Sequence, residues 1–240
     1  GVLVPMMQTA RGCPYACTFC TEGGSYFQKV KRFSRERIEA ELKYIVERVK
    51  VNDLMIVDAN FGMFKEDLET THMLAELKEK YNWPKCVIAA TAKNNKKRII
   101  EIVNVLGSNT MAPSFSIQTT DEEVLKHIKR KNPPLDQMIK LGIAANEMGL
   151  QSKAEIILCL EGDNKSVHFK SVFDTLDAGI SYILIHQFRM LPGTESASKE
   201  TREKFGFQTR YRVLPRCFGI YEFRGEPFRS AEIEEIVVGN

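Results

Sequence analysis

The sequence lacks the features that would assign it to several common classes of protein. It contains no apolar run of the roughly 18 residues that a membrane-spanning helix needs and no pattern typical of a signal peptide. Its net charge is only +3. The short basic run at 93–98 opens a helical pattern, and we interpret it as a solvated face. We therefore expect neither a membrane nor a nucleic acid as partner.

Histidine and cysteine are also sparse, with four and six residues in a chain of 240. A disulfide framework would be denser and would occur in a shorter chain, so we expect a reducing, cytoplasmic compartment. Three cysteines cluster at positions 13, 17 and 20, and the others are scattered. Cys86 and Cys159 fall in strand-like runs and are interpreted as small buried hydrophobic residues. We expect a structural role for Cys217; the alternative is a thiol that faces the substrate.

The remaining pattern is that of one α/β domain, in which short β-rich runs alternate with amphipathic runs of helical length. The predicted strands are 2–9, 53–59, 86–92, 111–118, 152–160 and 182–188. The predicted helices are 35–49, 65–81, 96–106, 121–128, 135–148 and 166–178. Right-handed crossovers between six parallel strands predict a partial (β/α)6 TIM-like barrel.

The alternation stops near residue 194. We expect a barrel over residues 1–194 and a C-terminal helix and strand extension over residues 195–240. The chain begins inside a strand-like run without an initiator Met and ends within another pattern. We expect both ends to have been cut from a longer protein.

Polar side chains gather near the C-terminal ends of the predicted strands. Three share a face of the fourth strand (Ser114, Ser116 and Gln118), and three share a face of the fifth (Lys153, Glu155 and Cys159). Asp58 and Lys93 lie at or just past two other strand ends, and His186 on the sixth strand points at the site or packs outward. This polarity predicts a wet, ligand-filled barrel mouth, with ordinary loop polarity as the alternative.

The strongest signal is RGCPYACTFC at 11–20, which places Cys13, Cys17 and Cys20 on one loop directly after the first strand. Three thiolates in this spacing can bind three irons of a 4Fe–4S cubane and leave the fourth iron open to a substrate. Gly12 and Pro14 suit a loop wrapped around an inorganic core. A structural zinc site would need a fourth ligand, usually from a second C-x-x-C pair that the sequence lacks.

The motif resembles that of the radical S-adenosylmethionine (SAM) superfamily. Further segments resemble the subgroup that often carries a cobalamin-binding domain before the barrel: DANF at 58–61, SIQ at 116–118, KR at 129–130, AEIIL at 154–158 and LPGT at 191–194. The resemblance implies that SAM chelates the open iron and that one electron from the cluster cleaves it. The product is a 5′-deoxyadenosyl radical that abstracts hydrogen from substrate.

The resemblance also implies roles for single residues. Phe19 corresponds to a residue near the adenine, with core packing as the alternative. Asp58 and Asn60 lie where the family has a glycine-rich segment that contacts the SAM amino group, although this chain lacks the Gly-Gly-Glu form. Ser116 and Gln118 correspond to contacts with the SAM ribose or carboxylate.

The resemblance implies roles for two more residues, and one segment departs from the family pattern. Arg130 would pair with the SAM carboxylate, with a surface arginine as the alternative, and Glu155 would lie near the adenosyl group. After the fifth strand the family often has Leu-Pro-Gly-Glu-Thr, whereas this chain has LEGDN at 160–164. Because Glu161 replaces the proline, we interpret this loop as shaped for a different substrate.

The leading hypothesis is a radical SAM enzyme acting on a small molecule or natural product, with cobalamin-dependent methyl transfer as one outcome. It would bind cobalamin through a domain outside this chain and receive electrons from a flavodoxin or ferredoxin. The alternatives are a tRNA methylthiotransferase-like enzyme, a non-catalytic iron–sulfur electron carrier and a zinc-stabilised module. The first of these usually has an RNA-binding domain and a second cluster, which the sequence does not contain.

Overall fold

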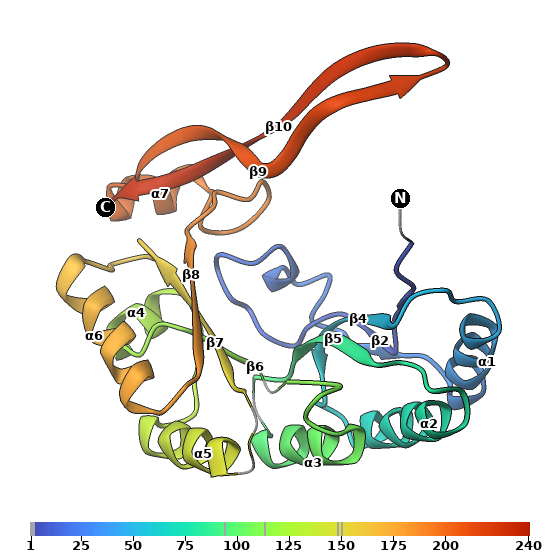
Figure 1. Cartoon of the computed structure of the whole chain (residues 1–240). Coiled ribbons are helices and arrows are strands. Elements are labelled where there is room, and N and C mark those ends of the chain that lie inside the picture. The colour runs from blue at the N-terminus through green and yellow to red at the C-terminus, as the bar shows by residue number, and fades with distance from the viewer. Residues whose placement is uncertain (1–2, 94, 113, 148, 150) are drawn as a thin grey trace.

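A computed structural model describes residues 3–93, 95–112, 114–147, 149 and 151–240. Its centre is a set of six parallel strands in two three-stranded sheets (Figure 1). The first sheet has the order β1 (Met6–Met7), β4 (Asp53–Phe61) and β5 (Cys86–Thr91). The second has the order β6 (Ser114–Gln118), β7 (Lys153–Leu158) and β8 (Tyr182–Gln187). The Thr91 hydroxyl donates to the Ser114 carbonyl at 2.5 Å and joins the two sheets.

The helices run along the outer side of this curved set of strands (Figure 1). In chain order they are α1 (Arg35–Val46), α2 (Glu66–Tyr81), α3 (Lys96–Leu106), α4 (Glu122–His127), α5 (Leu135–Glu147) and α6 (Lys165–Asp177). Alternation of parallel strands and outer helices confirms the predicted partial barrel. Among the described residues, no helix has the length and apolarity to cross a membrane.

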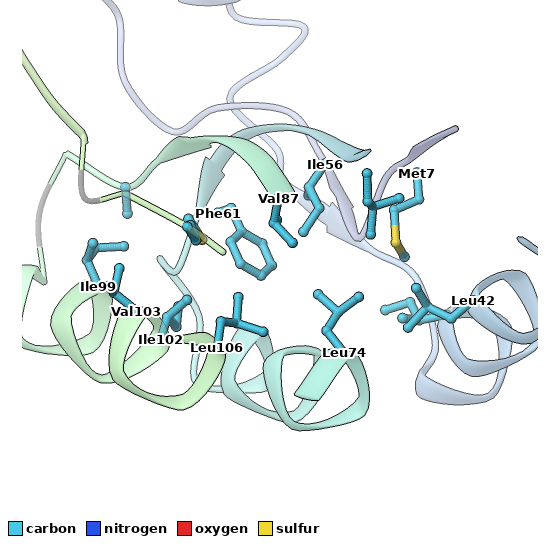
Figure 2. Close-up of a cluster of buried hydrophobic side chains, with 14 of the residues drawn as sticks. Met7, Leu42, Ile56, Phe61, Leu74, Val87, Ile99, Ile102, Val103 and Leu106 are labelled. Atoms are coloured by element: carbon cyan, nitrogen blue, oxygen red, sulfur yellow. The ribbon is translucent and has the colours of Figure 1, made fainter. Parts of the chain in front are cut away.

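The first half of the barrel holds the largest hydrophobic core, between β1, β4 and β5 on one side and α1, α2 and α3 on the other (Figure 2). Burial alternates along β4, where Leu54 and Ile56 face the helices and Val57 faces the other way, 42% exposed. Phe61 and Leu74 are fully buried in this core. Residues 54–57 are all apolar, so this alternation of burial follows from the packing of one strand face against the helices and not from an alternating sequence.

The first predicted strand differs from the structure. Residue 2 lies outside the described part of the chain, residues 3–9 form only the short strand β1, and a second short strand, β2 (Ala10–Arg11), follows. Asp58 accepts hydrogen bonds from the backbone of Thr9 at 2.7 Å and of Ala10 at 3.1 Å. Because these amides bond to a side chain, the backbone leaves the parallel sheet, and β2 pairs antiparallel with β3 (Lys31–Arg32).

After β8 the chain forms α7 (Lys199–Phe205) and a long antiparallel hairpin of β9 (Gln208–Phe223) and β10 (Glu226–Gly239). The base of the hairpin is attached to the segment after β8: the Val237 amide donates to the Phe188 carbonyl, and the Met190 amide donates to the Glu235 carbonyl, both at 2.9 Å. The far end of the hairpin extends away from the barrel (Figure 1).

Candidate active site

The three clustered cysteines lie on the segment of residues 12–30, here called the cluster loop, which the β2–β3 pair closes at its base. Gly12 has φ +105, and a Cβ there would lie 2.5 Å from the Phe27 carbonyl oxygen. A Cβ on Gly23 would lie 2.2 Å from the Cys17 carbonyl oxygen. Both positions exclude a side chain, so glycine is what allows the loop to fold back on itself.

The three thiols are free, with Cys13 and Cys17 buried and Cys20 half-buried. Burial raises the pKa of the Cys20 thiol, nearby Lys93 lowers this pKa, and the other two thiols raise it. No group of three or more His, Cys, Asp or Glu side chains in the described residues is arranged to hold a single metal ion. A cubane needs no such convergence, because each thiolate binds a different iron.

Three nitrogen donors approach the thiols from the surrounding barrel. Asn60 Nδ2 donates to Cys13 Sγ at 3.1 Å, and Lys93 Nζ lies 3.5 Å from Cys17 Sγ. The Arg130 guanidinium lies 4.0 Å from the same sulfur, and its other end donates to the Ser116 carbonyl. These donors would stabilise negative charge on the sulfurs, so the residues fit an anionic iron–sulfur group.

Arg130 is 6% exposed, and burial lowers the pKa of its guanidinium. The surface-arginine alternative is therefore wrong. The interpretation of 93–98 as a solvated face is also wrong at two positions. Lys93 faces the cluster loop, with its Nζ 4.6 Å from the centre of the Tyr15 ring, and Arg98 donates to the carbonyls of Gly62 and Met63.

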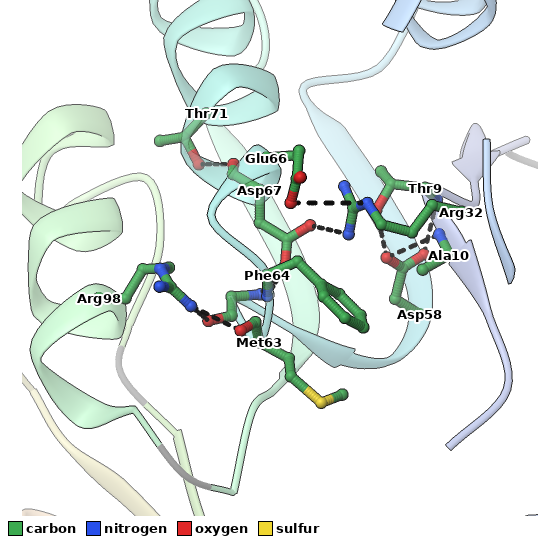
Figure 3. A network of polar contacts seen from close by, with 11 residues as sticks. Thr9, Ala10, Arg32, Asp58, Met63, Phe64, Glu66, Asp67, Thr71 and Arg98 are labelled. Carbon is green, nitrogen blue, oxygen red and sulfur yellow. Dashed lines mark hydrogen bonds and ion pairs between the residues drawn. The ribbon is translucent and has the colours of Figure 1, made fainter. Parts of the chain in front are cut away.

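Asp58 lies beneath the cluster loop, and its carboxylate is already engaged in hydrogen bonds. Its carboxylate accepts hydrogen bonds from the backbone amides of Thr9 and Ala10, just before the loop, and from the Thr9 hydroxyl (Figure 3). Burial raises the pKa of this carboxyl, and the hydrogen bonds oppose the rise. Arg32 at the other base of the loop pairs with buried Asp67 at 2.8 Å. Asp58 and Asp67 thus fix the two ends of the loop.

A cavity of about 270 Å³ opens beside the third cysteine. Four residues singled out from the sequence line it together with Cys20: Phe19, Gln118, Glu155 and His186. His186 therefore faces the site. Glu155 pairs with Lys153 at 3.2 Å. Larger hollows of about 630 and 610 Å³ lie between β1 and α1, and no cysteine lines them.

The alternation of side chains between the two faces of β6 and β7 stops at the C-terminal end of each strand. Gln118 and Cys159 have φ of +68 and +67, which reverses the backbone and ends the alternation. Cys159 follows the end of β7 and packs against the hydrophobic cluster around Leu160 and Phe188, as does Ile157. That Cys159 shares a face with Glu155 stays a prediction. Its thiol pKa is raised by partial burial.

The sequence predicts no partner for two residues at the site. Lys93 is among the strand-end residues that predict the barrel mouth, but its contact with Cys17 is visible only in the structure. The sequence places Glu161 in a loop shaped for substrate, but its side chain is fully buried and accepts a hydrogen bond from Thr18 of the cluster loop at 2.7 Å. No local pattern predicts that contact, because the two residues are 143 positions apart.

Comparison with known proteins places this geometry in a family. Residues 7–169 match the model of the Radical SAM superfamily. The cobalamin-dependent radical SAM methyltransferase TokK of Streptomyces tokunonensis is 32% identical over 236 residues, 97% of this chain and 34% of that protein. The 2-(S-pantetheinyl)-carbapenam-3-carboxylate methyltransferase of Streptantibioticus cattleyicolor is 30% identical over the same share of both chains. The chain spans about a third of the length of these curated relatives.

Solved structures show the same fold at low sequence identity. The radical S-adenosylmethionine methyltransferase TsrM from Kitasatospora setae has a TM-score of 0.71 at 11% identity, covering 88% of this chain and 41% of that one. Coproporphyrinogen III oxidase (HemN) from Escherichia coli has a TM-score of 0.61 at 12% identity, covering 86% of this chain and 54% of that one. With a family match over most of the barrel and three cysteines at its mouth, this chain belongs to the Radical SAM superfamily.

Proposed function

We propose that this chain is the catalytic barrel of a radical SAM methyltransferase, with a 4Fe–4S cluster bound by Cys13, Cys17 and Cys20. The observation that carries the proposal is the cluster loop itself, where three free thiols lie beside nitrogen donors and next to a cavity. The bound cluster would supply the electron that cleaves SAM. The chain's residues would bind SAM, orient it and exclude water.

Asn60 gives a specific fit for SAM. Its Nδ2 is occupied by Cys13 Sγ, while its buried Oδ1 has no hydrogen-bond partner among the described residues. A buried acceptor without a donor is costly unless a ligand supplies one. The amino group of SAM is such a donor. Asn60, rather than the fully engaged Asp58, is therefore proposed as the residue that contacts the amino group.

The remaining residues divide between the two ends of SAM. Arg130 and Lys93 supply positive charge beside Cys17, where the SAM carboxylate would lie. Phe19, Gln118, Glu155 and His186 line the cavity on the Cys20 side, which would hold the adenosyl group. Ser116 acts through its carbonyl, which holds Arg130 in place.

The relatives suggest the wider reaction. One is named as a cobalamin-dependent radical SAM methyltransferase and another as a carbapenam methyltransferase. We propose cobalamin-dependent methyl transfer to a small natural product, with cobalamin bound outside this chain and a flavodoxin or ferredoxin as electron donor. The barrel would comprise residues 1–194 and the extension residues 195–240. The six free cysteines favour a reducing, cytoplasmic location.

The test uses the full-length protein, produced with cobalamin and reconstituted with iron and sulfide under anaerobic conditions. We expect a 4Fe–4S spectrum, retained cobalamin after desalting and reductive formation of 5′-deoxyadenosine from SAM. Asn60→Ala should weaken SAM binding while four irons remain. An intact, reduced cluster that cannot cleave SAM would favour an electron carrier. Absence of cobalamin would leave a cobalamin-independent radical enzyme.

A further inference from the structure

Glu161 lies directly beneath the cluster loop and connects it to a distant part of the chain. Its Oε1 accepts from the Thr18 hydroxyl at 2.7 Å and from the Ser196 hydroxyl. The Ser196 amide also donates to the Thr18 carbonyl at 3.0 Å. Thr18, Glu161 and Ser196 are 3%, 0% and 0% exposed. We call these three residues the buried tie.

The buried tie joins the two walls of the cavity beside Cys20. One wall is the stretch of cluster loop that follows Thr18, beginning with Phe19 and Cys20. The other is the segment after β8, including Phe188 and Leu191, which leads into the turn that carries Ser196. A change in the tie would alter the spacing of these walls, while Cys13, Cys17 and Cys20 would stay together on one loop.

Stability alone does not account for a carboxylate at this position. Glu161 Oε2 is buried without a hydrogen-bond partner among the described residues. Burial of a carboxylate with one bare oxygen is costly, and well-packed apolar residues in place of such a polar group are often neutral or stabilising. A buried carboxylate that costs stability and joins the two walls of a cavity indicates a positional role for Glu161.

We propose that Glu161 is a positioning residue that holds the cluster loop and the segment after β8 at the spacing that SAM requires. This inference rests on the proposed SAM site and adds a residue to it. Glu161 itself would not contact SAM. It acts through Thr18 and Ser196, whose hydroxyls share one carboxylate oxygen.

The test compares Glu161→Gln, Glu161→Leu and the triple variant Thr18→Val/Glu161→Leu/Ser196→Ala in the full-length, reconstituted enzyme. Exposed Glu200→Leu is the control. Gln keeps an acceptor oxygen, so its KM for SAM should stay within about twofold of wild type, whereas Leu and the triple variant should raise this KM about tenfold. All variants should retain the wild-type iron content. The triple variant leaves no hydroxyl unpaired and should unfold at or above the wild-type temperature.

A higher KM for SAM in a protein of equal or greater stability is the signature that a merely structural role would not produce. A triple variant with the wild-type KM overturns the proposal. Hydrogen exchange at the Thr18 and Ser196 amides of the SAM-free protein is measured alongside and should speed up about tenfold in the triple variant. If wild-type enzyme fails to cleave SAM, the proposed function falls. In that case unchanged exchange at these two amides overturns the tie, and faster exchange supports it.

Discussion

The two halves of the barrel differ in how they are packed and in what they contribute to the cavity beside Cys20. The first half, β1, β4 and β5 with α1 to α3, packs around one continuous hydrophobic core. The second half, β6 to β8 with α4 to α6, has two smaller buried clusters. Its strands instead contribute Gln118, Glu155 and His186 to the cavity. Polar side chains that line a cavity cannot also pack as core.

The cluster loop depends on both halves. From β4, Asp58 holds the backbone just before the loop and Asn60 reaches the loop itself, while Arg130 follows α4 and Glu161 follows β7. Because its core is larger, we expect the first half to be the more rigid support of the loop and the second half to rearrange more easily. The following changes test this division.

The largest effect is expected from the cysteines. Replacing Cys17 with Ala removes one of three cluster ligands, and no fourth thiol on the loop can replace it. We expect loss of the cluster and of SAM cleavage. Circular dichroism should change little, because the thiol belongs to the loop and not to the core of either half. Cys86→Ala is the matched control and should keep its iron. Full iron content in Cys17→Ala would refute the ligand assignment.

Two matched leucines compare the halves directly. Leu74 in α2 and Leu160 after β7 are both fully buried. Leu-to-Ala substitutions cost about 2–5 kcal/mol, with the largest losses where the core cannot collapse around the cavity. We expect Leu74→Ala near the upper end and Leu160→Ala near the lower end, measured by native-state hydrogen exchange at the β4 and β7 amides. Equal losses would mean that the second half is as rigidly packed as the first.

A smaller effect should follow from the charge beside the cluster. Lys93 Nζ lies 3.5 Å from Cys17 Sγ. A nearby positive charge stabilises the reduced, more negative cluster, so Lys93→Met should lower its reduction potential, by on the order of 50–100 mV. Exposed Lys97→Met on α3 is the control. Redox titration monitored by electron paramagnetic resonance measures both, and an unchanged potential in Lys93→Met would exclude an electrostatic role.

Much of this architecture follows from local sequence signals. Strand and helix periodicity predict the β/α order, and the spacing of Cys13, Cys17 and Cys20 predicts the loop. What local patterns miss depends on distant contacts. Asp58 ends the first parallel strand early by bonding amides about fifty residues earlier in the chain, and Glu161 meets Thr18 across the barrel. The contacts of Arg130 are likewise visible only once β6 and the cluster loop are folded together.

The smallest effect concerns the attachment of the hairpin to the second half. Glu235 on β10 pairs with Arg202 on α7 at 2.6 Å, and the hydrogen bond from Arg202 lowers the pKa of Glu235 from 4.5 to about 2. A carboxyl with a depressed folded-state pKa stabilises the fold above its unfolded pKa, and this stabilisation disappears as the pH falls from 4.5 toward 2. Both side chains are partly exposed, so Glu235→Gln should cost less than about 1 kcal/mol at neutral pH. The difference in unfolding temperature between wild type and Glu235→Gln should shrink across that acidic window, with exposed Glu226→Gln at the hairpin tip as the control. A difference that persists at pH 2 would mean that packing, rather than the ion pair, attaches the hairpin.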